Sequence, residues 1–317
     1  MISFKNFEEA GKQALDLLHK RLDFKLWMIT RIEGDEAIVL QADSNTYNIK
    51  PGHVFYWDDS YCRHMTEGKA PNIAPIVADI PLYASANLNK LIDIKSYIGY
   101  PLLNEDGSVF GTICAIDPEP KSEEIKKEAD LIETICSMLC YLLQGELREN
   151  VQNRLLERLE VEALTDSLTG LYNRRAWDKL VASEEERCKC YGLPASVFII
   201  DLNNIKEIND SLGHFSGDDL IKKTAIILKE CTRDKDVVAR LGGDEFGILS
   251  VENSYIGCEK LSERILDAFR EKRINTAVGY AIRHPSYDLY HTIIQADKNM
   301  YLHKRQLKEN IKSHPIS

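Results

Sequence analysis

"RLGGDEFGIL", residues 240–249, places two glycines and two acids between two apolar runs. The runs 237–241 and 246–249 are each typical of a β-strand, so Gly242 to Glu245 are expected to form a hairpin turn. A turn uses the conformational freedom of glycine. It does not require two carboxylates next to two residues that have no side chain. The stretch therefore predicts a β-hairpin whose turn belongs to a functional site.

A second buried strand is expected at 194–204, and it ends near Asp201. A carboxylate there is costly unless it is paired, solvated or bound to a cation. If this strand neighbours the hairpin in one sheet, Asp201 and Asp244 converge on a hard divalent ion. Mg²⁺ prefers a few carboxylates together with phosphate oxygens, and Gly242 and Gly243 would let the backbone approach phosphates. The chain has no P-loop motif, so a nucleotide site of another kind is indicated.

The segment "DLNNIKEINDSLGHFSGDD", residues 201–219, adds polar side chains after that strand: Lys206, Asn209, His214 and Asp218. Asn and Asp side chains together can read the guanine edge. Each residue also has a simpler explanation. Asp218 would serve as a helix N-cap, Asn209 with Asp210 would form a turn, and His214 would be an ordinary loop histidine.

Composition and charge limit the class of protein. The 317 residues predict two domains. Fifty acidic against 40 basic residues give a net charge of −10, which argues against binding nucleic acid or an anionic membrane, because both need a basic surface. No apolar run reaches the roughly 18 residues of a membrane span, and the charged N-terminus does not resemble a signal peptide. A cytoplasmic protein is expected.

The eight cysteines are expected to be free thiols packed as small hydrophobes. No pair of C-x-x-C units is present, and the spacing gives little support to a zinc site.

The order of periodic segments predicts an α+β or α/β protein. Residues 1–22 read as an amphipathic helix, and strand-like runs follow at 24–32, 36–43, 96–103 and 108–117. The C-terminal half alternates strands and helices, which predicts helices packed against a mixed sheet. Its expected elements are strands at 194–204 and 275–283, the hairpin at 237–250, and helices at 217–233, 256–272 and 289–309.

A long helix is predicted over about 119–166, because apolar residues recur there at intervals of three and four. About 40 helical residues extend ~60 Å, more than one small domain spans. The second half has few apolar residues per turn and cannot be a core helix. It is either an exposed rigid linker or a parallel dimeric coiled coil, and its narrow apolar stripe favours the dimer.

Four motifs in order resemble the GGDEF family of diguanylate cyclases, which condense two GTP molecules into cyclic di-GMP. They are "LTDSLTGLYNRRAW" (164–177), "DLNNIKEINDSLGHFSGDDL" (201–220), "RLGGDEF" (240–246) and "ADKNMYLHK" (296–304). The resemblance implies a palm-like cyclase domain in which the 3′-oxygen of one GTP attacks the α-phosphorus of another. One GTP is bound per domain, so two domains must meet. A long helix that pairs with its copy in a homodimer would bring the two domains together.

The resemblance also implies roles for particular residues. The metal ligands for Mg²⁺ or Mn²⁺ are expected to be Asp201, Asp244 and the Leu202 carbonyl. The catalytic set is Asp201, Asp244 and Glu245, with Asp244 the candidate for activating the 3′-hydroxyl. The substrate-binding set is Asn209 and Asp218 for guanine, Lys304 and Lys308 for phosphate, and Lys206, His214 and Gly243.

Some positions depart from the family pattern. Asn203 and Ile205 replace the common Asp and Phe, but neither position is a direct ligand, so activity is expected to survive. Leu307 replaces a glycine and Glu309 follows Lys308, which weakens the assignment of Lys308. Asp218 is retained, which favours guanine over adenine.

Arg233-Asp234-Lys235-Asp236 lies five residues before the double glycine and matches the family's RxxD inhibitory site for product. Arginine pairs with phosphate or guanine, and a carboxylate accepts from guanine N–H groups, so Arg233 and Asp236 suit that ligand. A charged turn between a helix and a strand is the simpler alternative.

Three segments of the N-terminal half and the helix after them share a pattern of strands and turns: "SYCRHM" (60–65), "GKAPNIAPIVAD" (68–79) and "IKSYIGYPLLNEDGSVFGTICAIDPEP" (94–120). On this pattern residues 1–140 resemble a GAF domain, a small-molecule sensor and dimerisation module built on an antiparallel sheet with helices. Its ligand would be a nucleotide, haem, a tetrapyrrole or none. Cys62 with His64 suggests chromophore attachment, but Arg63 separates them, so a packed cysteine is favoured. The aromatics there either line a pocket or pack in the core: Trp27, Tyr56, Trp57 and Tyr61.

The sequence thus predicts a GAF sensor domain at 1–140, a signalling helix at 120–163 and a GGDEF domain at 164–312. The expected protein is a homodimeric diguanylate cyclase that pairs through the GAF domain and the helix, with GTP as substrate and cyclic di-GMP as product and feedback ligand. The alternatives are a catalytically silent receptor for GTP or cyclic di-GMP, and a dimerisation scaffold.

Overall fold

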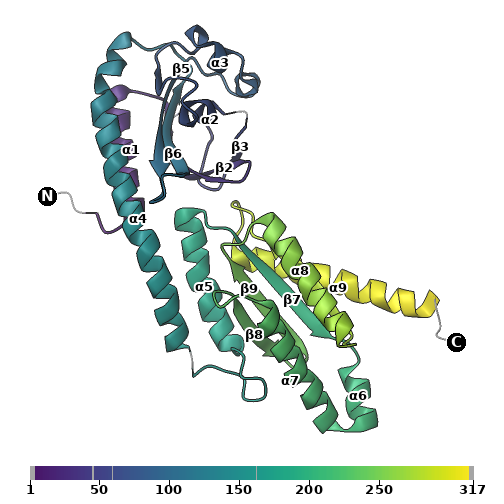
Figure 1. Ribbon diagram of the computed structural model, residues 1–317. Coiled ribbons are helices and arrows are strands. Elements are labelled where there is room, and N and C mark those ends of the chain that lie inside the picture. Colours follow the sequence, from purple (N-terminus) through teal and green to yellow (C-terminus); the bar gives the residue numbers. More distant parts are fainter. Residues whose placement is uncertain (1–3, 45, 59, 162, 314–317) are drawn as a thin grey trace. The chain divides into compact units, whose positions relative to one another are not determined.

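The computed structural model describes residues 4–44, 46–58, 60–161 and 163–313. The chain divides into two units (Figure 1). Each unit has its own hydrophobic cores. The N-terminal unit runs to Gln152 and includes Lys189–Gly192, while the C-terminal unit holds Asn153–Cys188 and continues from Leu193. None of the helices in the described ranges combines the length and apolar composition needed to cross a membrane.

A six-stranded antiparallel sheet forms the centre of the N-terminal unit, in the order β3-β2-β1-β6-β5-β4. The strands are β1 (Leu26–Glu33), β2 (Glu36–Ser44), β3 (Val54–Tyr56), β4 (Ile73–Ala74), β5 (Ser96–Leu103) and β6 (Val109–Asp117). Asn104 and Gly107 close the predicted β5–β6 hairpin through a backbone hydrogen bond of 3.0 Å. The antiparallel sheet with helices predicted for this half is therefore observed.

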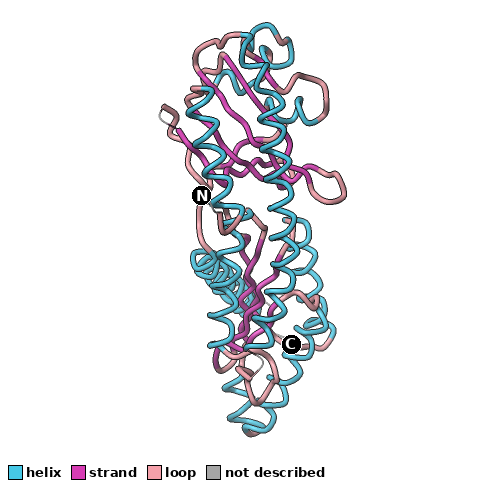
Figure 2. Tube along the Cα trace, turned by 90° about the vertical axis from the view of Figure 1, so that its left-hand side faces the viewer, coloured by secondary structure: helices cyan, strands magenta, loops and turns pink. Residues whose placement is uncertain are grey.

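Helical segments cover both faces of this sheet: α1 (Phe7–Leu22), α2 (Tyr61–Thr66), α3 (Pro81–Ala84), α4 (Ala129–Glu160) and the 3₁₀ segments Val77–Asp79, Asn87–Lys90 and Glu123–Glu128. Alternate side chains of a strand point to opposite faces. Trp27 and Ile29 accordingly pack in the core with α1 and α4, whereas Leu26 and Cys114 pack in the core with α2 and α3. Figure 2, viewed from the side of α1 and α4, shows these two helices running along the strands.

The long helix α4 begins at Ala129, after a 3₁₀ segment, and ends at Glu160, so it is shorter at both ends than the predicted helix. Its first half buries four residues at spacings of four, three and four: Ile132, Cys136, Leu139 and Leu143. Its second half leaves Val151, Leu155 and Leu159 more than half exposed. The second half is therefore not a core helix, as its composition predicted.

A four-stranded sheet in the order β10-β7-β9-β8 forms the C-terminal unit. Its strands are β7 (Ala195–Leu202), β8 (Val237–Gly242), β9 (Glu245–Val251) and β10 (Thr276–Ile282). Its helices are α5 (Arg174–Tyr191), α6 (Ile205–Leu212), α7 (His214–Cys231), α8 (Tyr255–Glu271) and α9 (Leu289–Ser313). The order of elements from β7 to β10 is the split βαβ arrangement.

The prediction of a mixed sheet was wrong for the named strands, which pair only antiparallel. The reason lies in the crossover. Helices α6 and α7 carry the chain from β7 to β8, which runs parallel to β7, but β9 inserts between the two. The only parallel pairing among the described residues is a single bridge between Tyr172 and Ala239.

Both faces of β7 are buried, which explains its unbroken apolar run. Phe198 and Ile200 pack in one core with residues of α7 and α8, while Val197 and Ile199 pack in another with residues of α5 and α9. Helices α5 and α6 were not predicted as separate elements. Helix α7 begins at His214, three residues before the predicted start.

Candidate active site

The predicted hairpin lies directly beside the end of β7. Asp201 is paired with Glu245 in the β7–β9 register, and the backbone N–H of Leu202 donates to the carbonyl of Asp244 at 3.1 Å. Gly243, with a φ of +28°, stands in the turn. The structure therefore brings together the three acids that the sequence picked out in two separate segments.

The charges around these acids favour a cation. Burial, followed by the nearby carboxylates of Asp201 and Asp244, raises the pKa of Glu245. Lys304, on α9, donates from Nζ to Oδ1 of Asp201 at 2.5 Å. Asp201 is 7% exposed, so this lysine supplies the positive charge that a buried carboxylate needs.

The donor set fits a hard cation such as Mg²⁺, which takes carboxylate and phosphate oxygens. No group of three or more His, Cys, Asp or Glu side chains with metal-binding geometry occurs within the described ranges. The metal ligands expected from the family resemblance include only two carboxylates, those of Asp201 and Asp244, together with the Leu202 carbonyl.

Arg240 fixes the hairpin to a distant loop, and the sequence did not single it out. Its guanidinium donates to the Gly243 carbonyl at 2.7 and 3.0 Å and to both carboxylate oxygens of Asp166 at 3.1 and 3.2 Å. Burial opposes the charged form of Asp166, but hydrogen bonds from Thr169 and Arg240 outweigh it and lower the pKa of this carboxyl. The "LTDSLTGL" segment is thus linked through Arg240 to the turn between β8 and β9.

The predicted guanine-reading residues come from two adjacent helices, α6 and α7. Asn209, on α6, has a buried Oδ1 without a hydrogen-bond partner. It lies against Gly217 of α7, where an added Cβ would stand only 2.0 Å from that Oδ1. Asp218 is exposed and lies in the second turn of α7, whose N-cap is Gly213, so the N-cap alternative for Asp218 is wrong. An unpartnered buried amide oxygen beside an exposed carboxylate is an arrangement able to accept hydrogen bonds from a base.

The other predicted substrate-binding residues are less closely tied to this centre. Lys206 on α6, His214 at the start of α7 and Lys308 on α9 are all exposed. Leu307 packs against the α5–α9 core, which accounts for an apolar residue where the family has glycine.

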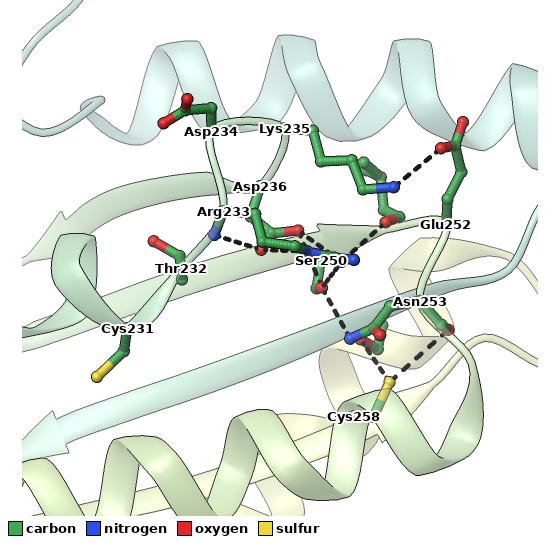
Figure 3. A network of polar contacts seen from close by, with 12 residues as sticks. Cys231, Thr232, Arg233, Asp234, Lys235, Asp236, Ser250, Glu252, Asn253 and Cys258 are labelled. Carbon is green, nitrogen blue, oxygen red and sulfur yellow. Dashed lines mark hydrogen bonds and ion pairs between the residues drawn. The ribbon is translucent and has the colours of Figure 1, made fainter.

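The loop between α7 and β8 carries the RxxD motif in a polar network (Figure 3). The Asp236 carboxylate is fully buried and accepts from the backbone N–H and side chain of Arg233 and from Oγ of Ser250. Arg233 also donates to Oγ of Ser250 and to the Val251 carbonyl, each at 3.2 Å, and its side chain stays 43% exposed. Arg233 is therefore accessible to a ligand, whereas Asp236 holds the loop.

The last turns of α4 are anchored to the same region of the C-terminal unit. Arg158 donates to the carbonyls of Asp234 and Lys235. Arg154 pairs with Glu184 at 2.8 Å and with Glu252. The end of the connecting helix therefore contacts the backbone of the RxxD loop directly.

Residues 163–310 match the family model described as "Diguanylate cyclase, GGDEF domain". This segment is a GGDEF domain, which confirms the resemblance for the C-terminal half. Diguanylate cyclase DgcP of Escherichia coli K12 is 26% identical over 269 residues, which make up 84% of this chain and 78% of that protein.

Other relatives are matched over shorter stretches. Probable diguanylate cyclase DgcC of Escherichia coli K12 is 37% identical over 34% of this chain and 30% of its own length. Cyclic di-GMP phosphodiesterase NbdA of Pseudomonas aeruginosa is 42% identical over 33% of this chain and only 14% of its own length. The chain therefore spans less than a third of these two proteins. Among solved structures, the GGDEF domain of DgcB from Caulobacter crescentus in complex with c-di-GMP is 27% identical, with a TM-score of 0.41 over 45% of this chain and 91% of that chain.

Proposed function

We propose that this protein is a diguanylate cyclase that condenses two GTP molecules into cyclic di-GMP with release of pyrophosphate. The observation that supports this most strongly is the convergence of Asp201, Asp244 and Glu245 with Lys304 at the end of β7. A silent receptor would have no need of three carboxylates at one site, and Lys304 alone compensates only one of them, Asp201. The matched family and the named cyclases among the relatives agree with this function.

Each side chain has a role in this proposal. Asp201, Asp244 and the Leu202 carbonyl would hold Mg²⁺ or Mn²⁺, which when bound polarises phosphate oxygens and neutralises their charge. Asp244 would accept the proton of the 3′-hydroxyl. Lys304 would leave Asp201 and bind phosphate once the site is loaded. Positioning and charge neutralisation then supply most of the catalysis.

Synthesis is expected to require a divalent cation. With EDTA in excess, cyclic di-GMP formation by the purified protein should fall below detection, and added Mg²⁺ or Mn²⁺ should restore it. Chromatographic quantification of the products measures this. Synthesis that persists in EDTA, with metal content checked by mass spectrometry, would remove the metal role of Asp201 and Asp244.

Guanine recognition is expected to depend on Gly217, although this residue has no side chain. In Gly217→Ala the new Cβ collides with the Asn209 amide, so the KM for GTP should rise about tenfold, as for one lost hydrogen bond to a polar ligand. The helix itself should not weaken, since alanine favours helices by about 1 kcal/mol over glycine. The matched control is Gly145→Ala on α4, where the added Cβ meets open space. An unchanged KM in Gly217→Ala would exclude Asn209 from the GTP site.

A homodimer is proposed because one domain carries one set of guanine-reading residues, while the product needs two GTP molecules. Exposed apolar side chains on the second half of α4 support pairing through this helix: Val151, Leu155, Leu156 and Leu159. Burying them against a second copy would stabilise a parallel helix pair. We further propose that residues 1–140 are a GAF domain that contributes to the dimer and regulates the cyclase.

Feedback by the product is proposed at the RxxD loop, with Arg233 as the residue that contacts the ligand. In Arg233→Ala the inhibition constant of cyclic di-GMP should rise at least about tenfold, because a charge-assisted contact is lost. The initial rate should stay unchanged. Asp236→Ala should also relieve inhibition, but it should destabilise the unit by about 1–3 kcal/mol, since its buried partners lose their acceptor. Unaltered inhibition in Arg233→Ala would leave the motif as a structural turn.

A further inference from the structure

The N-terminal unit encloses a cavity that the proposed catalytic function does not use. Its volume is about 290 Å³, and it lies between the sheet, α2 and the segments around β3 and the 3₁₀ helix Asn87–Lys90. Cys62, Tyr97 and Cys114 line it from α2, β5 and β6. Three of its strand residues, Tyr97, Cys114 and Ile116, belong to the core with α2 and α3, on the sheet face away from α1 and α4.

Charged side chains are missing from the described lining of the cavity. Among the described residues that line it, none is Asp, Glu, Lys, Arg or His. A nucleotide or another phosphate-bearing ligand would need a cationic partner in such surroundings. The described lining therefore offers an anionic ligand no cationic side chain.

Most polar groups in the lining are already paired within the protein. The Thr30 hydroxyl is bonded to the Thr112 hydroxyl at 2.8 Å, Ser60 Oγ donates to the Trp57 carbonyl at 2.7 Å, and the Tyr97 hydroxyl donates to Sγ of Cys62 at 3.3 Å. The Tyr61 hydroxyl likewise donates to Asn89. A ligand would find few free hydrogen-bonding groups, so apolar contact must supply its affinity.

The volume of the cavity and the residues at its entrance limit the size of the ligand. A cavity of ~150 Å³ lined by apolar side chains binds benzene, so 290 Å³ suits a molecule of about two fused rings. Tyr56 and Leu91 also line the cavity, yet they are 74% and 83% exposed. A bound ligand would cover these two exposed side chains, and the apolar surface removed from water would add to its affinity.

We propose that this cavity is the binding site for an uncharged, predominantly apolar bicyclic molecule. Its floor carries the thiols of Cys62 and Cys114, soft and polarisable groups suited to contact with an aromatic ring. Binding here is independent of whether the C-terminal unit is an active cyclase.

The test uses the full-length protein and indole as the probe, an uncharged bicyclic molecule, with cyclic GMP as the charged comparison. Isothermal titration calorimetry should give saturable indole binding at one site per chain, with a Kd below about 0.1 mM for so small a ligand. Cyclic GMP should neither bind in this unit nor displace indole. Indole heat without saturation, or displacement by cyclic GMP, would overturn the proposal.

Variants then locate the binding. Leu91→Ala at the entrance should weaken indole about five- to tenfold, through the loss of apolar contact. Leu82→Ala, another exposed leucine of this unit that does not line the cavity, is the matched control and should have no effect. Ala37→Phe should fill the cavity and abolish binding, with the fold checked by circular dichroism. Equal affinities in Leu91→Ala and Leu82→Ala would contradict binding in this cavity even if Ala37→Phe fails to fold.

Discussion

Asp244→Asn is expected to abolish cyclic di-GMP synthesis while leaving the protein folded. Asp244 stands in the turn between β8 and β9, and the fold uses its backbone carbonyl, which accepts from Leu202, rather than its carboxylate. Asparagine keeps the carbonyl and the shape of the side chain but removes the charge that would hold the cation and receive the 3′-hydroxyl proton. A loss of at least about a thousandfold in rate is expected, since metal-assisted charge stabilisation is worth several kcal/mol.

The control for this variant is Asp267→Asn, which alters an exposed carboxylate on α8 paired with Arg270. Both variants should give the circular dichroism spectrum and melting curve of the parent protein, and only Asp244→Asn should lose synthesis. Mixing Asp244→Asn with the parent protein should lower the parent's rate, since mixed dimers carry one defective half-site. A fully active Asp244→Asn would refute the role assigned to this carboxylate.

Glu184→Ala should cause a large loss of stability in the C-terminal unit. Glu184, on α5, is 2% exposed, and its carboxylate accepts from Arg154 at 2.8 and 3.0 Å and from Arg187 at 2.8 Å. Removing it leaves two partly buried guanidinium groups without this partner, which costs about 3–5 kcal/mol in buried ion pairs. Glu157 and Glu252 would remain as partial compensation.

Hydrogen exchange followed by mass spectrometry measures the loss of stability of the C-terminal unit, peptide by peptide, in the full chain. Peptides from β7 and β9 should exchange at least about a hundredfold faster in Glu184→Ala, since each 1.4 kcal/mol of lost stability speeds exchange by about tenfold. In Asp267→Ala, which removes an exposed pair, the same peptides should exchange at the parent rate. Parent-like exchange in Glu184→Ala would show that the ion network does not stabilise this unit.

The sequence predicted the elements whose signals are local. The apolar run of β7, the glycines of the hairpin and the periodic stripe of α4 each lie within about 30 consecutive residues, so pattern alone locates them. The proximity of the three acids of the candidate active site followed from these elements, because a strand end and a neighbouring turn place side chains at one edge of a sheet. The antiparallel pairing of all the strands could not be predicted in this way. It depends on the position of β9 between β7 and β8 in the sheet, which no local sequence pattern indicates.

Long-range contacts were beyond the sequence pattern. Arg240 and Asp166 are 74 residues apart, and nothing in either segment indicates that they pair. The close packing of Asn209 on Gly217 and the burial of Asp236 likewise depend on how helices and strands meet. Among the four aromatics considered for a pocket, Trp27 packs in the core with α1 and α4, while the others line the cavity.

The most direct test of the central claim is to incubate the purified full-length protein with GTP and Mg²⁺ and to identify the products by chromatography and mass spectrometry. The account predicts cyclic di-GMP and pyrophosphate. The rate of synthesis per chain should rise with protein concentration and level off once all chains are dimeric. If GTP remains unchanged, even when the chain is fused to a leucine zipper that enforces pairing, the protein is a receptor rather than a cyclase.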